Sequence, residues 1–120
     1  MRLQALRGAT TFAEDTKDEI DAKTQALVRE MLERNGIAHD DLVSIIFTAT
    51  DDLTAEFPAT SARALGLGDV PLLCARELGI AHGMKSTIRV LMHFYGNQQR
   101  ADLHHVYLEG ARSLRDDLPE

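Results

Sequence analysis

The clearest pattern in the chain is an amphipathic helix within residues 15–36. Apolar side chains recur at intervals of three, four and seven residues from Ile20 to Leu32, which is the spacing of one helix face. Thr16 and Glu19 form a capping box at its start, and Gly36 suits the left-handed position after its last turn. We therefore expect a helix here that packs its apolar stripe on a sheet.

Alternating or continuous apolar segments predict strands on either side of this helix. A first strand falls within residues 2–13, where Gly8 indicates a bulge or the close approach of another group. The near-continuous apolar run 41–50 is rich in β-branched residues and predicts a buried, central strand. Residues 87–96 predict a further strand. Its side chains would alternate between two faces, and Arg89 would share one face with Leu91, His93 and Tyr95.

Shorter elements complete the pattern. Pro58 is placed to start a short helix over 59–65, which the two following glycines end. The segment 70–74 predicts a short strand, and its early proline restricts it to a sheet edge or a strand start. A last strand is predicted around 104–111. One of its faces would carry His105, Tyr107 and Glu109.

The order of these elements is strand, helix, strand, short helix, short strand and two more strands. It predicts an α+β domain with helices on one face of a mixed β-sheet. With 120 residues, the chain is expected to form a single domain over 1–120. A sheet covered on one side must hide its other face, and a chain of this size cannot do so alone. We therefore expect self-association.

Composition narrows the possible partners. Hydrophobic residues make up 44%, which is enough for a packed core, while the net charge of −6 and the lack of tryptophan disfavour nucleic-acid binding. No apolar stretch approaches the ~20 residues of a membrane span. The start of the chain also lacks the features of a signal peptide. We expect a cytoplasmic protein that binds neither nucleic acid nor membrane.

Known metal and phosphate motifs are missing from the sequence. The five histidines lack ligand spacing, a single cysteine cannot build a cysteine-based zinc site, and no glycine-rich phosphate loop is present. We therefore expect no metal site and no phosphate-binding loop. Cys74, near Arg76 and Glu77, fits either a thiol nucleophile or a small core residue at the end of an apolar strand. The second is the more common situation.

What remains is a set of polar side chains on or beside the predicted strands. Its members are Arg7, Arg63, Glu77, Arg89, Tyr107 and Arg115. Taken alone, Arg7 also fits a solvated residue on the outer face of a strand. If the side chains converge, guanidinium groups and one carboxylate would line a pocket for a small polyanion that carries a hydroxyl group. From the residues alone, the chain is a small oligomeric α+β domain with a candidate anion site.

Five blocks of the sequence resemble the monofunctional bacterial chorismate mutases of the trimeric, pseudo-α/β-barrel class, often called the AroH class. They are LRGATTFAEDTKDEI, TATDDLTAEFPATSAR, VPLLCARELG, IRVLMHFY and HHVYLEGARSLRDDL, in the order of the family, and the resemblance runs from about Leu3 to Leu118. It implies a homotrimer whose sheets pack into a barrel-like core, with active sites at subunit interfaces. It also implies the Claisen rearrangement of chorismate to prephenate in phenylalanine and tyrosine biosynthesis, without cofactor, metal or covalent intermediate.

The resemblance implies roles for individual residues. Arg89 matches the arginine that points at the substrate's ether oxygen, Glu77 the carboxylate that accepts the ring hydroxyl, and Arg7 a residue near the side-chain carboxylate. Tyr107 matches a phenol that donates to a carboxylate. Wall and backbone contacts are expected from Leu72, Leu73, Cys74, Ala75 and Arg76, with Cys74 beside Glu77 and Arg76 largely solvated. The neighbouring subunit would supply Phe57, Ala59, Thr60 and Arg63, and the C-terminal flap would supply Leu114 and Arg115.

Two features depart from the family pattern. Thr60 stands where related sequences often carry a lysine, so one cation at the mouth of the site is missing. The sequence also ends at Glu120, from which we expect no longer tail over the site. Two other interpretations stay open: a non-catalytic trimeric module that binds an aromatic-pathway carboxylate, and an imine deaminase of the related trimeric fold. The five blocks lend no support to the deaminase.

Overall fold

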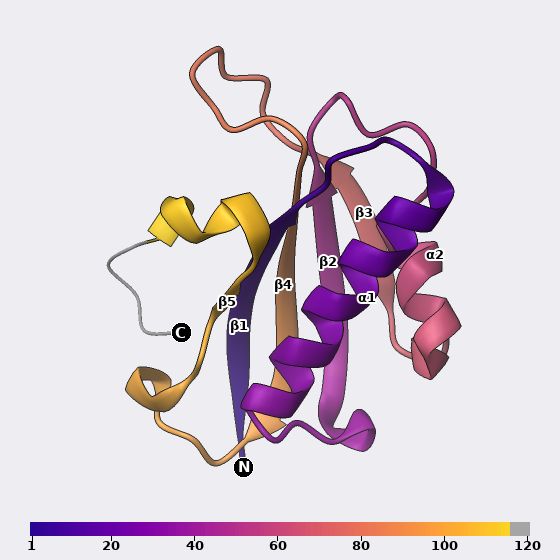
Figure 1. The fold of residues 1–120 in the computed structure, drawn as a ribbon. Coiled ribbons are helices and arrows are strands. Elements are labelled where there is room, and N and C mark those ends of the chain that lie inside the picture. Colours follow the sequence, from indigo (N-terminus) through magenta and orange to yellow (C-terminus); the bar gives the residue numbers. More distant parts are fainter. Residues whose placement is uncertain (116–120) are drawn as a thin grey trace.

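The computed structural model describes residues 1–115, except for the side chain of Arg115. Within this range the chain forms a five-stranded sheet in the order β3-β2-β4-β1-β5 (Figure 1). The strands are β1 (Arg2–Thr11), β2 (Leu42–Ala49), β3 (Leu72–Arg76), β4 (Thr87–Gly96) and β5 (Val106–Tyr107). Strand β4 runs antiparallel to β1 and β2, while the edge strands β3 and β5 run parallel to their neighbours. The sheet is therefore mixed, as predicted.

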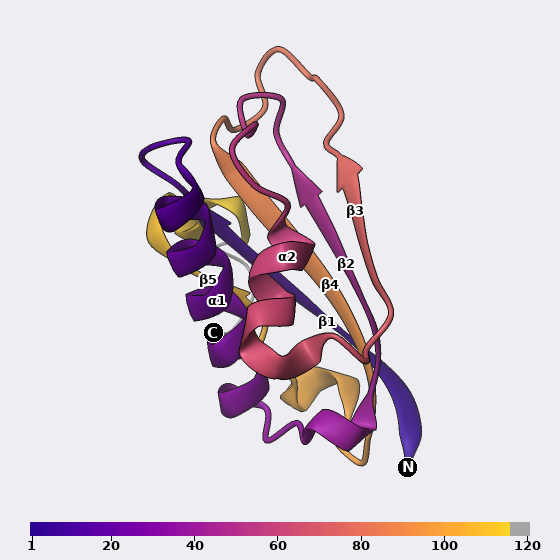
Figure 2. The same ribbon diagram turned by 90° about the vertical axis from the view of Figure 1, so that its right-hand side faces the viewer.

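Two helices cover one face of this sheet. They are α1 (Lys17–Arg34) and α2 (Pro58–Ala62), which continues into a further helical turn over Arg63–Leu67. Figure 2 shows both helices on the same side of the sheet. Short 3-10 segments lie at His39–Asp41, Arg100–Asp102 and Glu109–Arg115. This arrangement confirms the predicted α+β fold with helices on one face.

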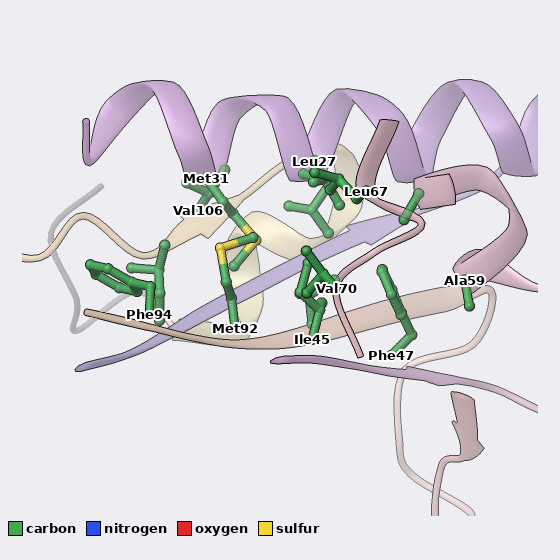
Figure 3. Packing of buried hydrophobic residues seen from close by; sticks show 14 of the residues in the cluster. Leu27, Met31, Ile45, Phe47, Ala59, Leu67, Val70, Met92, Phe94 and Val106 are labelled. Carbon is green, nitrogen blue, oxygen red and sulfur yellow. The ribbon is translucent and has the colours of Figure 1, made fainter. Parts of the chain in front are cut away.

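The hydrophobic core lies between α1 and the sheet. Leu27 and Met31 of the helix meet Ile45 of β2 and Met92 and Phe94 of β4, and all five side chains are fully or almost fully buried (Figure 3). The helix begins as predicted, because the Thr16 hydroxyl accepts a hydrogen bond from the Glu19 backbone N–H. The Glu19 carboxylate accepts from the backbone N–H of Ala13, so it ties down the segment that leads into the helix.

Gly8 marks a close approach of α1 to β1. A Cβ atom at this position would lie 2.5 Å from Met31 Sδ and 3.1 Å from Leu27 Cδ1. The pairing of β1 with β4 runs without a shift from Arg2 to Thr11, which rules out a bulge. Of the two readings of Gly8, the close approach is the one the structure confirms.

The last strand is shorter than the alternation predicts. Strand β5 contains only Val106 and Tyr107, and Glu109 has a φ of +54° at the start of a 3-10 segment. The backbone N–H of Gly110 donates to the Thr11 hydroxyl, which draws the chain across the end of β1 rather than along it. The prediction that Glu109 shares a strand face with Tyr107 is therefore wrong.

Strand β2 also differs from its prediction. It is an interior strand, but the central place belongs to β4, which pairs with both β1 and β2. Only alternate residues of β2, such as Ile45 and Phe47, are fully buried, because the helices cover one face alone. Ile46 on the other face is partly exposed. The apolar run thus reflects a second face that this single chain leaves open.

None of the described helices is long and apolar enough to cross a membrane. Across residues 1–115, no three histidine, cysteine, aspartate or glutamate side chains gather as metal ligands would.

Candidate active site

Polar side chains gather at one end of the sheet face that the helices leave open. The strand registers align Ala75, Thr48, Arg89 and Ala9 as successive neighbours across β3, β2, β4 and β1, and Ala9 pairs in turn with Tyr107 of β5. Side chains in register on one face lie side by side. The backbone pairing alone therefore brings together residues that are far apart in sequence.

A pocket of about 390 Å³ opens on this part of the face. Its polar wall consists of Arg7, Thr48, Arg89 and Tyr107, and its apolar wall includes Ile46 and Leu91. Two guanidinium groups give the pocket a positive character despite the net negative charge of the protein. The pocket can therefore attract an anion and pack an apolar ring against its floor.

Glu77 joins this pocket through Arg89 and Thr48. Its Oε1 atom lies 2.6 Å from Arg89 Nε, and the Thr48 hydroxyl donates to the same oxygen at 3.0 Å. The backbone N–H of Glu77 donates to the carbonyl of Ala49, which extends the β2–β3 pairing by one residue. The side chain of Glu77 is 22% exposed and that of Arg89 is 46% exposed. The carboxylate is thus held in place while the guanidinium faces the pocket.

The C-terminal 3-10 segment borders the pocket at Tyr107. This side chain is almost fully buried in a small cluster with Ala9 and Ala111, and Leu114 packs against the cluster. The predicted flap residue Leu114 is therefore close to a predicted site residue in the same chain. The side chain of Arg115, the second predicted flap residue, lies outside the described part of the structure.

The residues of α2 and its flanks lie on the other side of the sheet. The Arg63 guanidinium donates to the Thr60 hydroxyl at 3.2 Å, and Phe57 is 68% exposed just before the helix. A separate pocket of about 490 Å³ lies here, lined by Phe57 and its loop together with one edge of β3. Within one chain, the predicted residues Phe57, Ala59, Thr60 and Arg63 are therefore not brought to Arg89.

Strand β3 divides its predicted site residues between the two faces. Leu73 and Ala75 share the open face with Ile46 and Thr48, with which they pair. The other face of β3, which faces the core, carries Leu72, Cys74 and Arg76. Leu72 and Cys74 pack against the hydrophobic core. Alternation along a strand thus separates Cys74 from Glu77.

Cys74 has a structural contact in this fold. Its Sγ atom accepts a hydrogen bond from the backbone N–H of Ala59 at 3.4 Å, at the first turn of α2. Within one chain Cys74 does not lie beside Glu77, because the two residues are three apart on a strand and its extension. Cys74 lines the same pocket as Phe57, and its place beside Glu77 in the assembled site stays a prediction. The contact with the core matches the interpretation of Cys74 as a small core residue.

Arg76 braces the loop between β2 and α2. Its guanidinium donates to the carbonyl of Thr50 at 2.6 Å and to that of Leu53 at 3.2 Å. The side chain is 53% exposed, so it is partly solvated as expected, but it also has a defined role in holding the loop. That loop leads directly to Phe57.

Two carboxylates fix the same loop from other sides. Asp15 accepts hydrogen bonds from the Thr54 hydroxyl and from the backbone N–H groups of Thr54 and Ala55. The bond from the Thr54 side chain is the main reason why the pKa of Asp15 lies below its ordinary value. For Asp52, partial burial raises the pKa, but hydrogen bonds from Thr50 and Ser86 outweigh it and leave the pKa lowered.

Thr48 and Asp15 are the residues that sequence reasoning missed. Thr48 is a polar residue within an apolar run, and its two-residue spacing from Ile46 places both on the open face. That spacing was a usable signal, whereas the partner Glu77 depends on the pairing of β2 with β3. The contact of Asp15 with Thr54 joins segments 39 residues apart and has no local signal.

Comparison with known proteins identifies the family. The family model for chorismate mutase type I matches residues 3–118. The chain belongs to the chorismate mutase type I family. A chorismate mutase AroH from Thermus thermophilus is 43% identical over 117 residues, which cover 97% of this chain and 96% of that protein. The chorismate mutase AroH of Bacillus subtilis (strain 168) is 40% identical over 119 residues, covering 98% and 94%.

A solved structure agrees with the sequence comparisons. The chorismate mutase from Clostridium thermocellum Cth-682 superimposes with a TM-score of 0.89 at 46% identity, covering 92% of this chain and 98% of that one. These matches confirm the predicted family, the fold and the assignment of the chain as a chorismate mutase, which is an isomerase. They also decide against the deaminase and the non-catalytic module.

Proposed function

We propose that this chorismate mutase converts chorismate to prephenate at sites that two subunits of a homotrimer share. The observation that carries the proposal is the placement of Arg89 in a pocket on the open face, paired with Glu77, while Arg63 and Phe57 lie on the helix-covered side. A second subunit is then needed to bring both sets of residues to one substrate. Each chain contributes a single domain over 1–120.

The reaction explains the types of residue in the pocket. Chorismate carries two carboxylates, a ring hydroxyl and an enolpyruvyl ether. Its C–O ether bond breaks ahead of the formation of the new C–C bond, so negative charge builds up on the ether oxygen. The product is an isomer, and no atom is gained or lost. An enzyme accelerates such a step by holding the reactive conformer and by placing fixed donors at the developing charge.

Arg89 is the proposed donor to the ether oxygen. It contacts Glu77 through Nε, so the terminal Nη groups can reach a ligand in the pocket. A guanidinium remains charged at all relevant pH values and needs no proton transfer during the reaction. Glu77 would accept the ring hydroxyl, and Arg7 and Tyr107 would bind the carboxylates. All four proposed roles rest on the position of these side chains in or beside one pocket.

The remaining residues receive roles according to their place in the fold. Leu73 and Ala75 would form the wall on the open face, and Leu72 and Cys74 would contribute only their backbone. Arg76 would act through the loop that it holds. Phe57, Ala59, Thr60 and Arg63 would close the site of the neighbouring subunit, with Leu114 and Arg115 at its rim.

The exposed apolar surface supports the trimer. On the open face Leu3 is 58% exposed, Leu73 60% and Tyr95 49%, and large apolar side chains exposed in this number on one face are expected to be covered by a partner. In a cyclic trimer the open face of each subunit would meet a different surface of the next subunit, and this contact would repeat around the ring. The cytoplasmic location and the role in phenylalanine and tyrosine biosynthesis remain predictions from the sequence.

Two measurements test the proposal. Purified protein incubated with chorismate should deplete the ultraviolet absorbance of chorismate, and prephenate should form; a rate equal to that in buffer would refute the activity. Light scattering should give a mass about three times the 13.3 kDa of the chain. A monomer with full activity would refute the shared site while leaving the reaction in place.

A further inference from the structure

The carboxylate of Glu77 receives one ion pair and one hydrogen bond, both on the same oxygen. Arg89 Nε lies 2.6 Å from Oε1, and Thr48 Oγ1 lies 3.0 Å from the same atom. Within residues 1–115 both donors act on Oε1, which leaves Oε2 to accept a hydrogen bond from a ligand. The orientation of the carboxylate about its terminal bond therefore depends on these two donors.

The two donors differ in rigidity. Thr48 is a β-branched residue within β2, flanked in register by Ala75 of β3 and Arg89 of β4. Its side chain has one rotatable bond to the hydroxyl-bearing carbon, and that bond is stiff. Arg89 has a long side chain that is 46% exposed and would change its contacts when an anion enters the pocket. Thr48 is thus the donor that can stay fixed during ligand binding.

Glu77 needs such a fixed donor because it stands at the end of an edge strand. Strand β3 ends at Arg76, and the residues from Leu78 to Lys85 form no helix or strand. On the backbone, Glu77 is tied to β2 by its N–H bond to Ala49. A glutamate side chain loses much rotational freedom when it is ordered, and each fixed contact offsets part of that cost.

We propose that Thr48 is a positioning residue that fixes the Glu77 carboxylate with Oε2 directed at the ring hydroxyl of the substrate. The inference rests on the proposed role of Glu77. Thr48 itself does not contact the reacting atoms. Its contribution is to keep the acceptor in place while the Nη groups of Arg89 bind the ether oxygen.

Three variants separate this role from a structural one. Thr48→Val removes the hydroxyl and keeps the shape, Thr48→Ser keeps the hydroxyl, and Ser44→Ala is the matched control. Ser44 lies four residues earlier on the same strand, and its hydroxyl bonds His93 Nδ1 at 3.2 Å instead of Glu77. We expect kcat/KM for chorismate to fall about tenfold to a hundredfold in Thr48→Val, the usual scale for one hydrogen bond to a charged group. Thr48→Ser and Ser44→Ala should stay within about threefold of the parent.

A double variant provides the second readout. In a Glu77→Gln background, Thr48→Val should cost less than about twofold further, because the carboxylate that Thr48 holds has been replaced. A general structural effect of Thr48→Val would instead persist in that background and would lower the Tm of the trimer. If Thr48→Val does not fold, Thr48→Ala removes the same hydroxyl and is subject to the same expectations.

The outcomes also distinguish this inference from the proposed function. If Glu77→Gln costs more than about tenfold in kcat/KM while Thr48→Val equals the parent, Thr48 has no positioning role and the role of Glu77 stands. If Glu77→Gln retains the turnover of the parent, the proposed role of Glu77 fails and the inference fails with it. Equal losses for Thr48→Val in both backgrounds would overturn the inference as well.

Discussion

Mixed trimers of two inactive variants provide the sharpest test of a shared active site. Arg89 lies on the open face of β4, whereas Arg63 follows α2 on the helix-covered side and contacts Thr60. One chain therefore cannot place both guanidinium groups on one substrate. The proposed variants are Arg89→Ala and Arg63→Ala, made in separate chains.

The expected activities follow from the geometry of a cyclic trimer. Arg89→Ala alone should lose ~10²–10³ in kcat, the usual scale for removing one preorganised donor to transition-state charge. Arg63→Ala should lose about tenfold or more in kcat/KM, since a charge-assisted bond to a carboxylate disappears. If each site takes Arg89 from one subunit and Arg63 from the next, any trimer that contains both variants has one intact site among about three. Random mixing of equal amounts should therefore restore about one quarter of the parent activity.

Co-expression with two different affinity tags allows the mixed trimers to be isolated and assayed by the loss of chorismate absorbance. They should show about one third of the parent kcat per chain, with a parent-like KM. The control is a chain that carries both substitutions, mixed with the Arg89→Ala chain, which can form no intact site. The shared site would be refuted if the activity of the mixed trimers equalled the average activity of the Arg89→Ala and Arg63→Ala homotrimers.

Further predictions concern packing, the thiol and pH. Gly8→Ala should destabilise the fold by about 1–3 kcal/mol in denaturant unfolding, because its Cβ would overlap Met31 Sδ; an unchanged midpoint would mean that the flexible Met31 side chain moves aside at no cost. Cys74→Ala should keep most of the turnover, since its thiol contacts the Ala59 backbone, and complete inactivation of a well-folded trimer would instead indicate a nucleophile. Asp15→Asn should lower the Tm at pH 6. Because the pKa of Asp15 is lowered in the folded state, this difference should be complete above the ordinary value of 3.8 and should disappear as the pH falls below it. A Tm gap independent of pH would contradict this.

Local patterns were sufficient for most of the fold. The spacing from Ile20 to Leu32 predicted α1, and alternation predicted the two faces of β4, because both depend only on neighbours along the chain. The length of β5 was not predictable, since a hydrogen bond from Gly110 to Thr11, 99 residues away, ends the strand. Non-local contacts of this kind leave no local periodicity.

Some features of the candidate site were likewise predictable from the sequence, whereas others depend on non-local contacts. Arg7, Arg89 and Tyr107 were predicted from the family resemblance, and the structure places them around one pocket. The separation of Cys74 from Glu77 follows from strand alternation and was available in the sequence, but the resemblance placed the two side by side. The contact of Thr48 with Glu77 needed the register of β2 with β3, which is a tertiary property.

The two sets of residues proposed to form one shared site are held in place in different ways. Arg7 and Arg89 stand on β1 and β4, which pair along ten residues in the interior of the sheet. The residues proposed to serve the neighbouring site stand instead on the short helix α2 or beside it, after a loop that needs separate anchors to hold the helix in place. Asp15 and Arg76 supply those anchors by bonding the loop backbone from two sides. Mutations at Asp15 should therefore affect turnover at the site to which its chain contributes Arg63 and not at the site to which it contributes Arg89, and in mixed trimers the loss should follow the subunit that supplies Arg63.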